Sequence, residues 1–95
     1  MSSQLEIAGS ARDNAIYIAK QELKRQNAML PKAYDVVVEN AEAGNELEAP
    51  RQVYQVSFSF YYRGRKQIIY TVIIDKRSGR VELFSDSRTS IPSEV

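Results

Sequence analysis

The sequence predicts a small α+β domain in which one N-terminal helix packs on a four-stranded antiparallel meander sheet. An apolar stripe at helical spacing comes first, and past a proline the chain continues in short alternating or β-branched segments. Turn residues rather than further helical segments separate these strands, so successive strands should pair as hairpins. At 95 residues the chain suits one domain, expected at residues 10–84 between a flexible N-terminus, 1–9, and a flexible tail, 85–95.

The helix is expected from Ala11 to about Ala28. Its apolar stripe consists of Ala11, Ala15, Ile16, Ile18, Ala19 and Leu23. Ser10 is the predicted N-cap, with the Asp13 carboxylate near the free N–H groups of the first turn. Tyr17 falls on the polar side of the helix and should be at least partly exposed.

A long hairpin forms the centre of the predicted sheet. Its first strand, Val53–Tyr62, alternates strictly, and its apolar side carries Tyr54, Val56, Phe58, Phe60 and Tyr62. The basic turn Arg63–Lys66 reverses the chain, because Gly64 is free to take positive φ. The β-branched run Ile68–Ile74 then returns as the second strand.

Two shorter strands flank this hairpin. Tyr34–Asn40 precedes it, with Tyr34, Val36 and Val38 facing the helix, and the acidic connection Ala41–Pro50 leads into the hairpin. Arg80–Phe84 follows it after the turn Asp75–Gly79.

The single predicted helix can cover only one face of the sheet. If the Tyr54 side is the core, the uncovered face carries Val53, Gln55, Ser57, Ser59, Tyr61, Ile69, Thr71, Ile73 and Asp75. A one-residue change in the turn would exchange the two faces, but either register leaves large β-branched residues uncovered. With Val37 these residues could form an apolar patch of the kind that marks an interface. The alternatives are that the tail folds over the patch, or that β-propensity alone accounts for the isoleucines.

Composition argues against catalysis. The chain has no histidine and no cysteine, which removes the commonest general base, the thiolate nucleophile and the usual transition-metal ligands. The acidic residues Glu42, Glu46 and Glu48 do not have the spacing of an EF-hand. We therefore expect no enzyme activity, no cofactor and no metal. The N-terminus does not resemble a signal peptide and no run approaches the ~20 apolar residues of a membrane span, so we expect a cytoplasmic protein unless a targeting segment is missing.

Three segments resemble the PepSY family, within the broader cystatin-like group of helix-on-sheet domains. They are the alanine-rich helix segment Ala15–Lys20, the Tyr-x-Val strand Val53–Val56, and the closing hairpin Tyr70–Asp75 with Ser78–Val81. The resemblance covers roughly residues 11–84 and implies a non-catalytic domain of the kind suspected of binding or restraining peptidases. True cystatins carry a Gln-x-Val-x-Gly hairpin and a Pro-Trp hairpin. Gln52–Val56 lacks that glycine and the chain has no tryptophan, so cathepsin-type inhibition is not expected.

These observations predict a non-catalytic protein-binding or inhibitory module that acts through the uncovered sheet face and the hairpin tips. The predicted partner-binding residues are Val53, Tyr61, Arg63, Arg65, Lys66, Ile69 and Ile73. The partner is another protein, such as a peptidase or another enzyme, or a second copy of the chain in a homodimer.

The alternative function is a nucleic-acid-binding adaptor. It would use the basic turn Arg63–Lys66 beside Tyr61 and Tyr62, since arginines next to aromatic rings can bind phosphate and stack on bases. Solvated turn charge is the simpler explanation, because hairpin tips are polar by default and the net charge is only +1. No acidic residue is expected near the Arg63–Lys66 turn, which makes it a contact point for an acidic partner.

Overall fold

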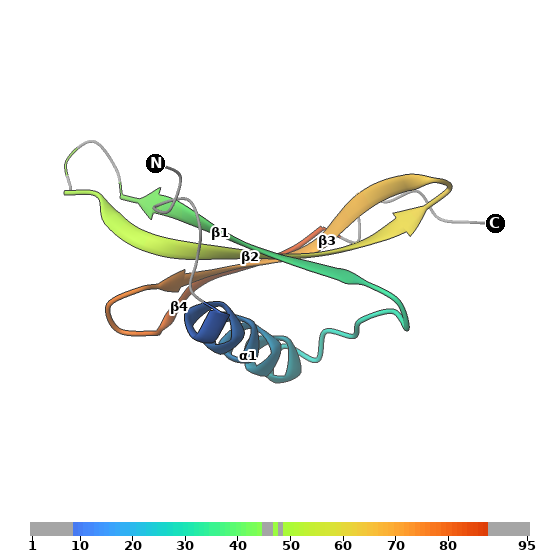
Figure 1. The fold of residues 1–95 in the computed structure, drawn as a ribbon, viewed down its shortest axis with the longest axis horizontal. Coiled ribbons are helices and arrows are strands. Elements are labelled where there is room, and N and C mark those ends of the chain that lie inside the picture. The colour runs from blue at the N-terminus through green and yellow to red at the C-terminus, as the bar shows by residue number, and fades with distance from the viewer. Residues whose placement is uncertain (1–8, 45–46, 48, 88–95) are drawn as a thin grey trace.

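The computed structural model describes residues 9–44, 47 and 49–87. In chain order its elements are α1 (Gly9–Arg25), β1 (Asp35–Ala43), β2 (Arg51–Tyr62), β3 (Arg65–Asp75) and β4 (Val81–Asp86). The strands form one antiparallel sheet in the order β1-β2-β3-β4, and α1 lies against one face of it (Figure 1). The predicted α+β fold, one helix on a four-stranded meander, is confirmed.

The helix begins earlier than expected. α1 starts at Gly9, so Ser10 lies in its first turn and the prediction that Ser10 is the N-cap is wrong. Tyr17 is 61% exposed, which confirms its predicted place on the polar side. On the opposite side of α1, the small side chains of Ala15 and Ala19 are buried against the sheet.

The helix also ends earlier than expected, in a Schellman motif. Asn27 has a φ of 56°, in the left-handed region that asparagine adopts more readily than most residues. The Ala28 N–H donates to the Leu23 carbonyl at 2.8 Å, and the Asn27 N–H donates to the Lys24 carbonyl at 3.1 Å. This cap turns the chain out of the helix at Arg25, three residues before the predicted end.

The core lies between α1 and the sheet. Its buried members are Ala15, Ala19, Leu23, Val56, Phe58, Ile69, Tyr70, Val72 and Ile74. The β2 residues among them confirm that the Tyr54–Phe58 side of the hairpin faces the helix. Burying a side chain the size of valine or phenylalanine contributes about 1.5–3 kcal/mol, so this cluster supplies much of the stability.

The turn between β2 and β3 is tighter than predicted. Tyr62 pairs with Arg65, which leaves only Arg63 and Gly64 in the loop. Their φ values are 55° and 79°. Two successive positive φ angles identify a type I′ turn, whose twist matches that of the strands.

A bulge in β3 changes which residues face the helix. Phe58 pairs with Tyr70, but the next residue, Ser59, pairs with Ile68. Ile69 is therefore an extra residue on β3, and it joins the helix-side core. Simple alternation with Tyr70 and Val72 predicts that Ile68 faces the helix, but it is 49% exposed.

The last strand reaches into the predicted tail. β4 ends at Asp86, and beyond it the Ser87 N–H donates to the Ile69 carbonyl at 2.8 Å. The start of the expected tail at residue 85 is thus wrong, because residues 85–87 pair with β3. The rest of the tail, residues 1–8, and the acidic residues at 46 and 48 lie outside the described residues.

Candidate binding surface

The face of the sheet that points away from α1, which we call the outer face, includes three rows of paired residues. One row is Val37, Ser57, Thr71 and Ser85, a second is Glu39, Gln55, Ile73 and Leu83, and a third is Asp35, Ser59 and Ile68. Paired residues on neighbouring strands share a face, and Ile73 alternates with the core residues Val72 and Ile74. In the part of the chain that the structure describes, no helix lies on this face (Figure 1).

Large apolar side chains are exposed on the outer face. Leu83 is 55% exposed, Ile68 is 49% exposed, and Val37 and Tyr61 are also exposed. Between them lie the small hydroxyl side chains of the Ser57 row. Ser57 itself is only 7% exposed, so it is the exposed apolar side chains on either side of it that make this face a candidate protein interface.

Only some of the predicted binding residues lie exposed on the outer face. Tyr61 is exposed and Ile73 is half-buried beside Leu83, both on the outer face as expected. Ile69 is only 3% exposed, because the bulge turns it into the helix-side core, so its predicted outward orientation is wrong. Val53 is only 1% exposed although it is not part of that core, so it cannot form an exposed patch.

Sequence reasoning missed Ile68 and Leu83. The residues from Ile68 to Ile74 are β-branched or aromatic on both sides of the strand, so nothing in the sequence locates a bulge or indicates that Ile68 is exposed. For Leu83 the sequence contains a weak indication of exposure, because its neighbour Phe84 is the larger apolar residue and the better candidate for the core. The structure packs Phe84 against the core and leaves Leu83 outside.

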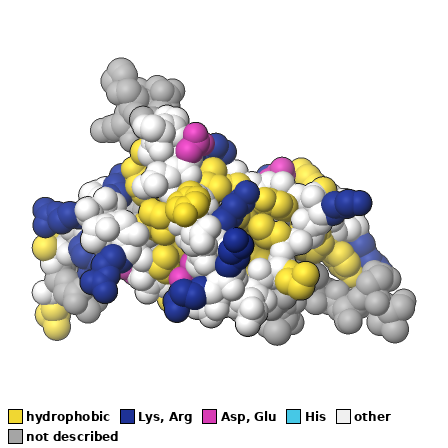
Figure 2. Space-filling model, turned by 90° about the horizontal axis from the view of Figure 1, so that it is seen from below, with side chains coloured by type: hydrophobic (Ala, Val, Ile, Leu, Met, Phe, Trp, Pro, Cys, Tyr) yellow, Lys and Arg dark blue, Asp and Glu magenta, His cyan; other side chains and the backbone are white. Residues whose placement is uncertain are grey.

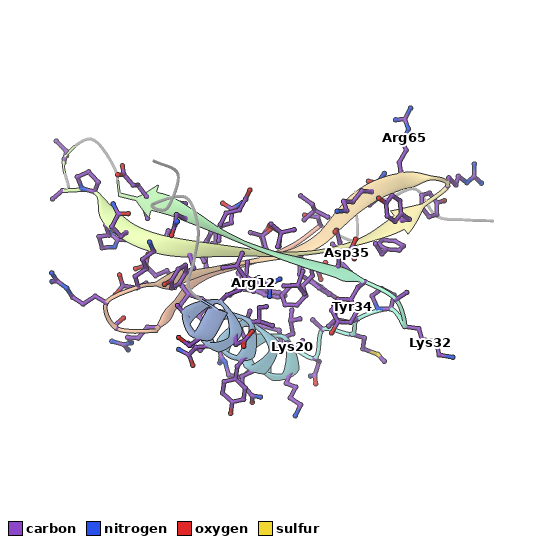
Figure 3. The ribbon with its side chains drawn as sticks, viewed as in Figure 1. Arg12, Lys20, Lys32, Tyr34, Asp35 and Arg65 are labelled. Atoms are coloured by element: carbon purple, nitrogen blue, oxygen red, sulfur yellow. The ribbon has the colours of Figure 1, made fainter. Side chains whose placement is uncertain are left out.

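The basic tip of the β2–β3 hairpin has an acidic neighbour after all. The Lys66 Nζ atom lies 3.5 Å from the Asp35 carboxylate, because β1 starts beside this end of the hairpin. The expectation that no acidic residue lies nearby is therefore wrong. The Arg63 guanidinium sits 5.7 Å from the centre of the Tyr62 ring. Arg65 points away from the helix side of the molecule (Figure 3), so the cations of this turn do not converge on one point.

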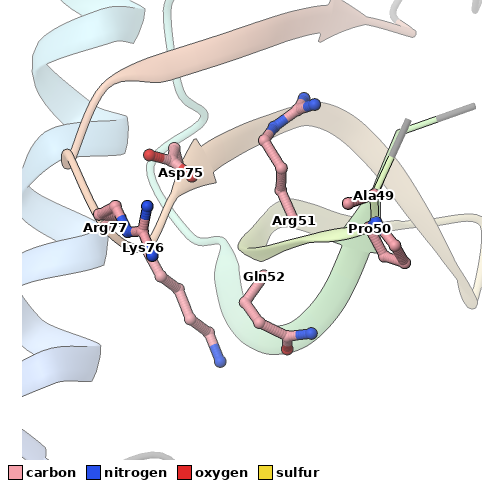
Figure 4. A pocket seen from close by; sticks show the side chains of 7 residues that line it. All are labelled: Ala49, Pro50, Arg51, Gln52, Asp75, Lys76 and Arg77. Atoms are coloured by element: carbon pink, nitrogen blue, oxygen red, sulfur yellow. The ribbon is translucent and has the colours of Figure 1, made fainter.

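A cavity of about 800 Å³ lies at the opposite end of the sheet. Its lining comprises Ala49, Pro50, Arg51, Gln52, Asp75, Lys76 and Arg77 (Figure 4). The Arg51 Nε atom donates to the Glu82 carboxylate at 3.2 Å, and the Lys76 ammonium lies 4.9 Å from the Tyr54 ring centre. Figure 4 shows Arg51 and Lys76 pointing in different directions. Arg51 and Lys76 are therefore engaged with other groups and diverge, so these two cations do not form a joint anion site.

The acidic group of this cavity is also engaged. Asp75 accepts hydrogen bonds from the Ser78 hydroxyl at 2.7 Å and from the Ser78 N–H at 2.9 Å. These two hydrogen bonds to the charged form lower the pKa of the Asp75 carboxyl below its ordinary value. The carboxylate is thus used to hold the turn between β3 and β4.

The described residues contain no cluster of three or more His, Cys, Asp or Glu side chains arranged to hold a metal ion. Within residues 9–44, 47 and 49–87, no helix is long and apolar enough to cross a membrane.

Compared with known proteins, the chain matches no family model, no curated protein and no solved structure. The helix-on-sheet architecture is compatible with the fold that the PepSY resemblance implies. Membership of that family stays a prediction.

Proposed function

We propose that the chain is a non-catalytic protein-binding module whose outer face binds a second copy of the same chain. The observation that carries the proposal is the exposure of Ile68 and Leu83 on a face that no described helix covers. Covering each of these side chains in an interface would contribute about 1–2 kcal/mol, which would favour association through this face.

The charges around the outer face are compatible with a second copy of the chain as the partner. Lys66 is paired with Asp35, and Arg51 is paired with Glu82. Because these two pairs are neutralised within the chain, they add little net charge that would select a highly charged partner. With a net charge of only +1, two copies repel each other weakly.

The sizes of the side chains on the outer face also suit a two-fold dimer. The row of Ser57, Thr71 and Ser85 consists of small side chains, with Ile73 and Leu83 standing beside it. In a two-fold arrangement the aliphatic side chains of one copy can pack over the hydroxyl row of the other. Two sheets packed face to face in this way lie about 10 Å apart.

The same charges weigh against the nucleic-acid alternative. A phosphate-binding turn needs cations that are available and that converge, whereas Lys66 is paired with Asp35 and Arg63 sits on the Tyr62 ring. These contacts therefore favour a protein partner over a nucleic acid.

The proposal is tested by two-dimensional NMR spectra recorded over a range of protein concentrations. Amide signals of residues around Ile68, Ile73 and Leu83 should shift or broaden as the concentration rises, while those of α1 should stay fixed. Spectra that do not change with concentration, or changes confined to α1, would overturn it.

A further inference from the structure

A groove on the helix side of the molecule is independent of the outer face. It has a volume of about 310 Å³ and lies between α1 and the connection that leads to β1. Tyr17, Lys20 and Lys24 line it from α1, and Ala28, Leu30 and Tyr34 line it from the connection. We propose that this groove binds an acidic peptide segment of a partner protein, with one aliphatic side chain of the peptide inserted between the two walls.

The groove has an apolar interior. Leu23, which also lines it, is buried, and Ala28 and Leu30 are half-buried and pack on the core. The Schellman motif at Asn27 directs the chain so that Ala28 and Leu30 form the wall opposite the helix. The volume is at the lower end of the range of about 300–1,000 Å³ for ligand sites, so it suits one side chain better than an extended ligand.

The rim of the groove is cationic. Lys20 and Lys24 are one helical turn apart on the same side of α1, and none of the lining residues is acidic. The Lys20 ammonium lies 5.5 Å from the centre of the Tyr34 ring, which keeps this charge at the groove. Figure 3 shows Lys20 and Tyr34 near the end of α1 that leads to the connection.

Neither lysine forms a salt bridge with a described residue. The acidic residue between them in sequence, Glu22, is already held by its neighbours. Its carboxylate accepts from Arg25 Nε at 3.0 Å, from Arg25 Nη2 at 2.9 Å and from Gln26 Nε2 at 2.6 Å. Two ammonium groups beside an apolar slot are therefore available to carboxylates from outside.

The charge distribution of the chain supports an acidic partner. Residues 9–34 contain five Lys or Arg residues and two Asp or Glu residues, a net charge of +3, whereas the whole chain carries +1. Figure 2, which views the molecule from the helix side, shows Lys and Arg side chains around the apolar surface and few acidic ones. Such a surface attracts acidic segments before contact is made.

The groove fits a peptide better than RNA or a bilayer. The Tyr34 ring packs against Phe58 at a centroid distance of 6.1 Å and lies under Lys20, so it is poorly placed to stack on a base. A lipid surface is flat, and it would leave the interior of the groove unfilled.

The test uses fluorescence polarisation with the full chain. The probe is a labelled peptide in which one leucine is flanked by glutamates, and a second probe replaces the glutamates with glutamines. Reversing both charges, Lys20→Glu with Lys24→Glu, should weaken binding of the acidic probe at least about tenfold, since two charge contacts become repulsive. Tyr17→Ala should weaken it about threefold or more by removing one apolar rim contact, and the glutamine probe should bind more weakly than the acidic one.

Arg12→Glu is the matched control, because Arg12 is exposed on the same helix but does not line the groove. It should change binding less than about twofold, and circular dichroism should show that all variants keep their helix content. The proposal is overturned if the acidic probe does not bind, or if Arg12→Glu weakens binding as much as the lysine reversal. It is also overturned if Tyr17→Ala has no effect, or if polyuridine RNA or phosphatidylserine vesicles bind through Lys20 and Lys24 while the peptide does not.

Discussion

The phenol oxygen of Tyr70 in β3 donates a hydrogen bond to the main-chain carbonyl of Met29 at 2.7 Å. Tyr70 is fully buried, and its ring stacks on Phe84 with centroids 5.8 Å apart. Met29 lies just beyond the helix cap, so this bond fastens the exit of α1 to the centre of the sheet. It also fixes the connection that forms one wall of the groove.

Replacing Tyr70 measures how much this hydrogen bond contributes to the free energy of unfolding. Tyr70→Phe keeps the buried ring and removes the donor to the Met29 carbonyl, so it should lower the free energy of unfolding by about 1 kcal/mol. Urea denaturation followed by circular dichroism gives the value. Tyr17→Phe, on the exposed side of α1, is the control and should change stability by less than about 0.5 kcal/mol. Equal effects of the two changes would contradict the role of the hydrogen bond.

Two adjacent isoleucines test the position of the bulge. Ile69 is in the core and Ile68 is half exposed on the outer face. Ile69→Ala should therefore cost about 2–5 kcal/mol of unfolding free energy, and Ile68→Ala less than about 1 kcal/mol. Chemical denaturation of the two variants provides the comparison. A larger loss for Ile68→Ala would mean that the strand keeps the simple alternation without a bulge.

The left-handed residue at the end of α1 gives a third test. Asn27 has a φ of 56°, which glycine adopts freely and a β-branched residue does not. Asn27→Val should lower the free energy of unfolding by about 1–2 kcal/mol, whereas Asn27→Gly should be close to neutral. The difference in thermal midpoint between these two variants reports the strain directly. If valine were tolerated as well as glycine, the Schellman motif would not be what ends this helix.

The Glu22 carboxylate should make the free energy of unfolding depend on pH. Hydrogen bonds from Arg25 and Gln26 lower the pKa of the Glu22 carboxyl below its ordinary value of 4.5, against the opposing effect of burial. Since the folded chain prefers the ionised form, this contribution is fully present above the unfolded pKa and is lost as the pH falls through the folded one. The stability difference between the natural chain and Glu22→Gln should thus shrink below about pH 4.5. Urea denaturation at neutral and acidic pH measures this difference. A difference that grows on acidification would contradict the claim that the folded state favours the ionised form of Glu22.

Some features of this fold can be predicted from the sequence alone. The strict alternation of Val53–Tyr62 places its apolar side on the helix, and the structure agrees because the period of β2 is uninterrupted and the extra residue of the bulge lies on β3. The spacing of Ala15, Ala19 and Leu23 likewise identifies the buried side of α1. Local periodicity carries this information, and it needs no knowledge of neighbours in space.

Other features depend on contacts between distant residues. The run Ile68–Ile74 carries β-branched or aromatic residues on both sides, so no alternation shows where β3 gains its extra residue. The salt bridge between Lys66 and Asp35 arises only once β1 and the hairpin tip lie at the same end of the sheet. The groove beside Lys20 depends on where the cap at Asn27 sends the chain, which the helical pattern does not specify.

The most direct test of the central proposal is sedimentation equilibrium of the natural chain beside Leu83→Asp. The natural chain should reach a dimer as its concentration rises. Leu83→Asp should stay monomeric, because a carboxylate would be buried in the interface without a partner. Asn14→Asp, which adds the same charge on an exposed position of α1, should dimerise like the natural chain. A natural chain that remains monomeric up to about 1 mM, or a Leu83→Asp variant that still dimerises, would contradict self-association through the outer face.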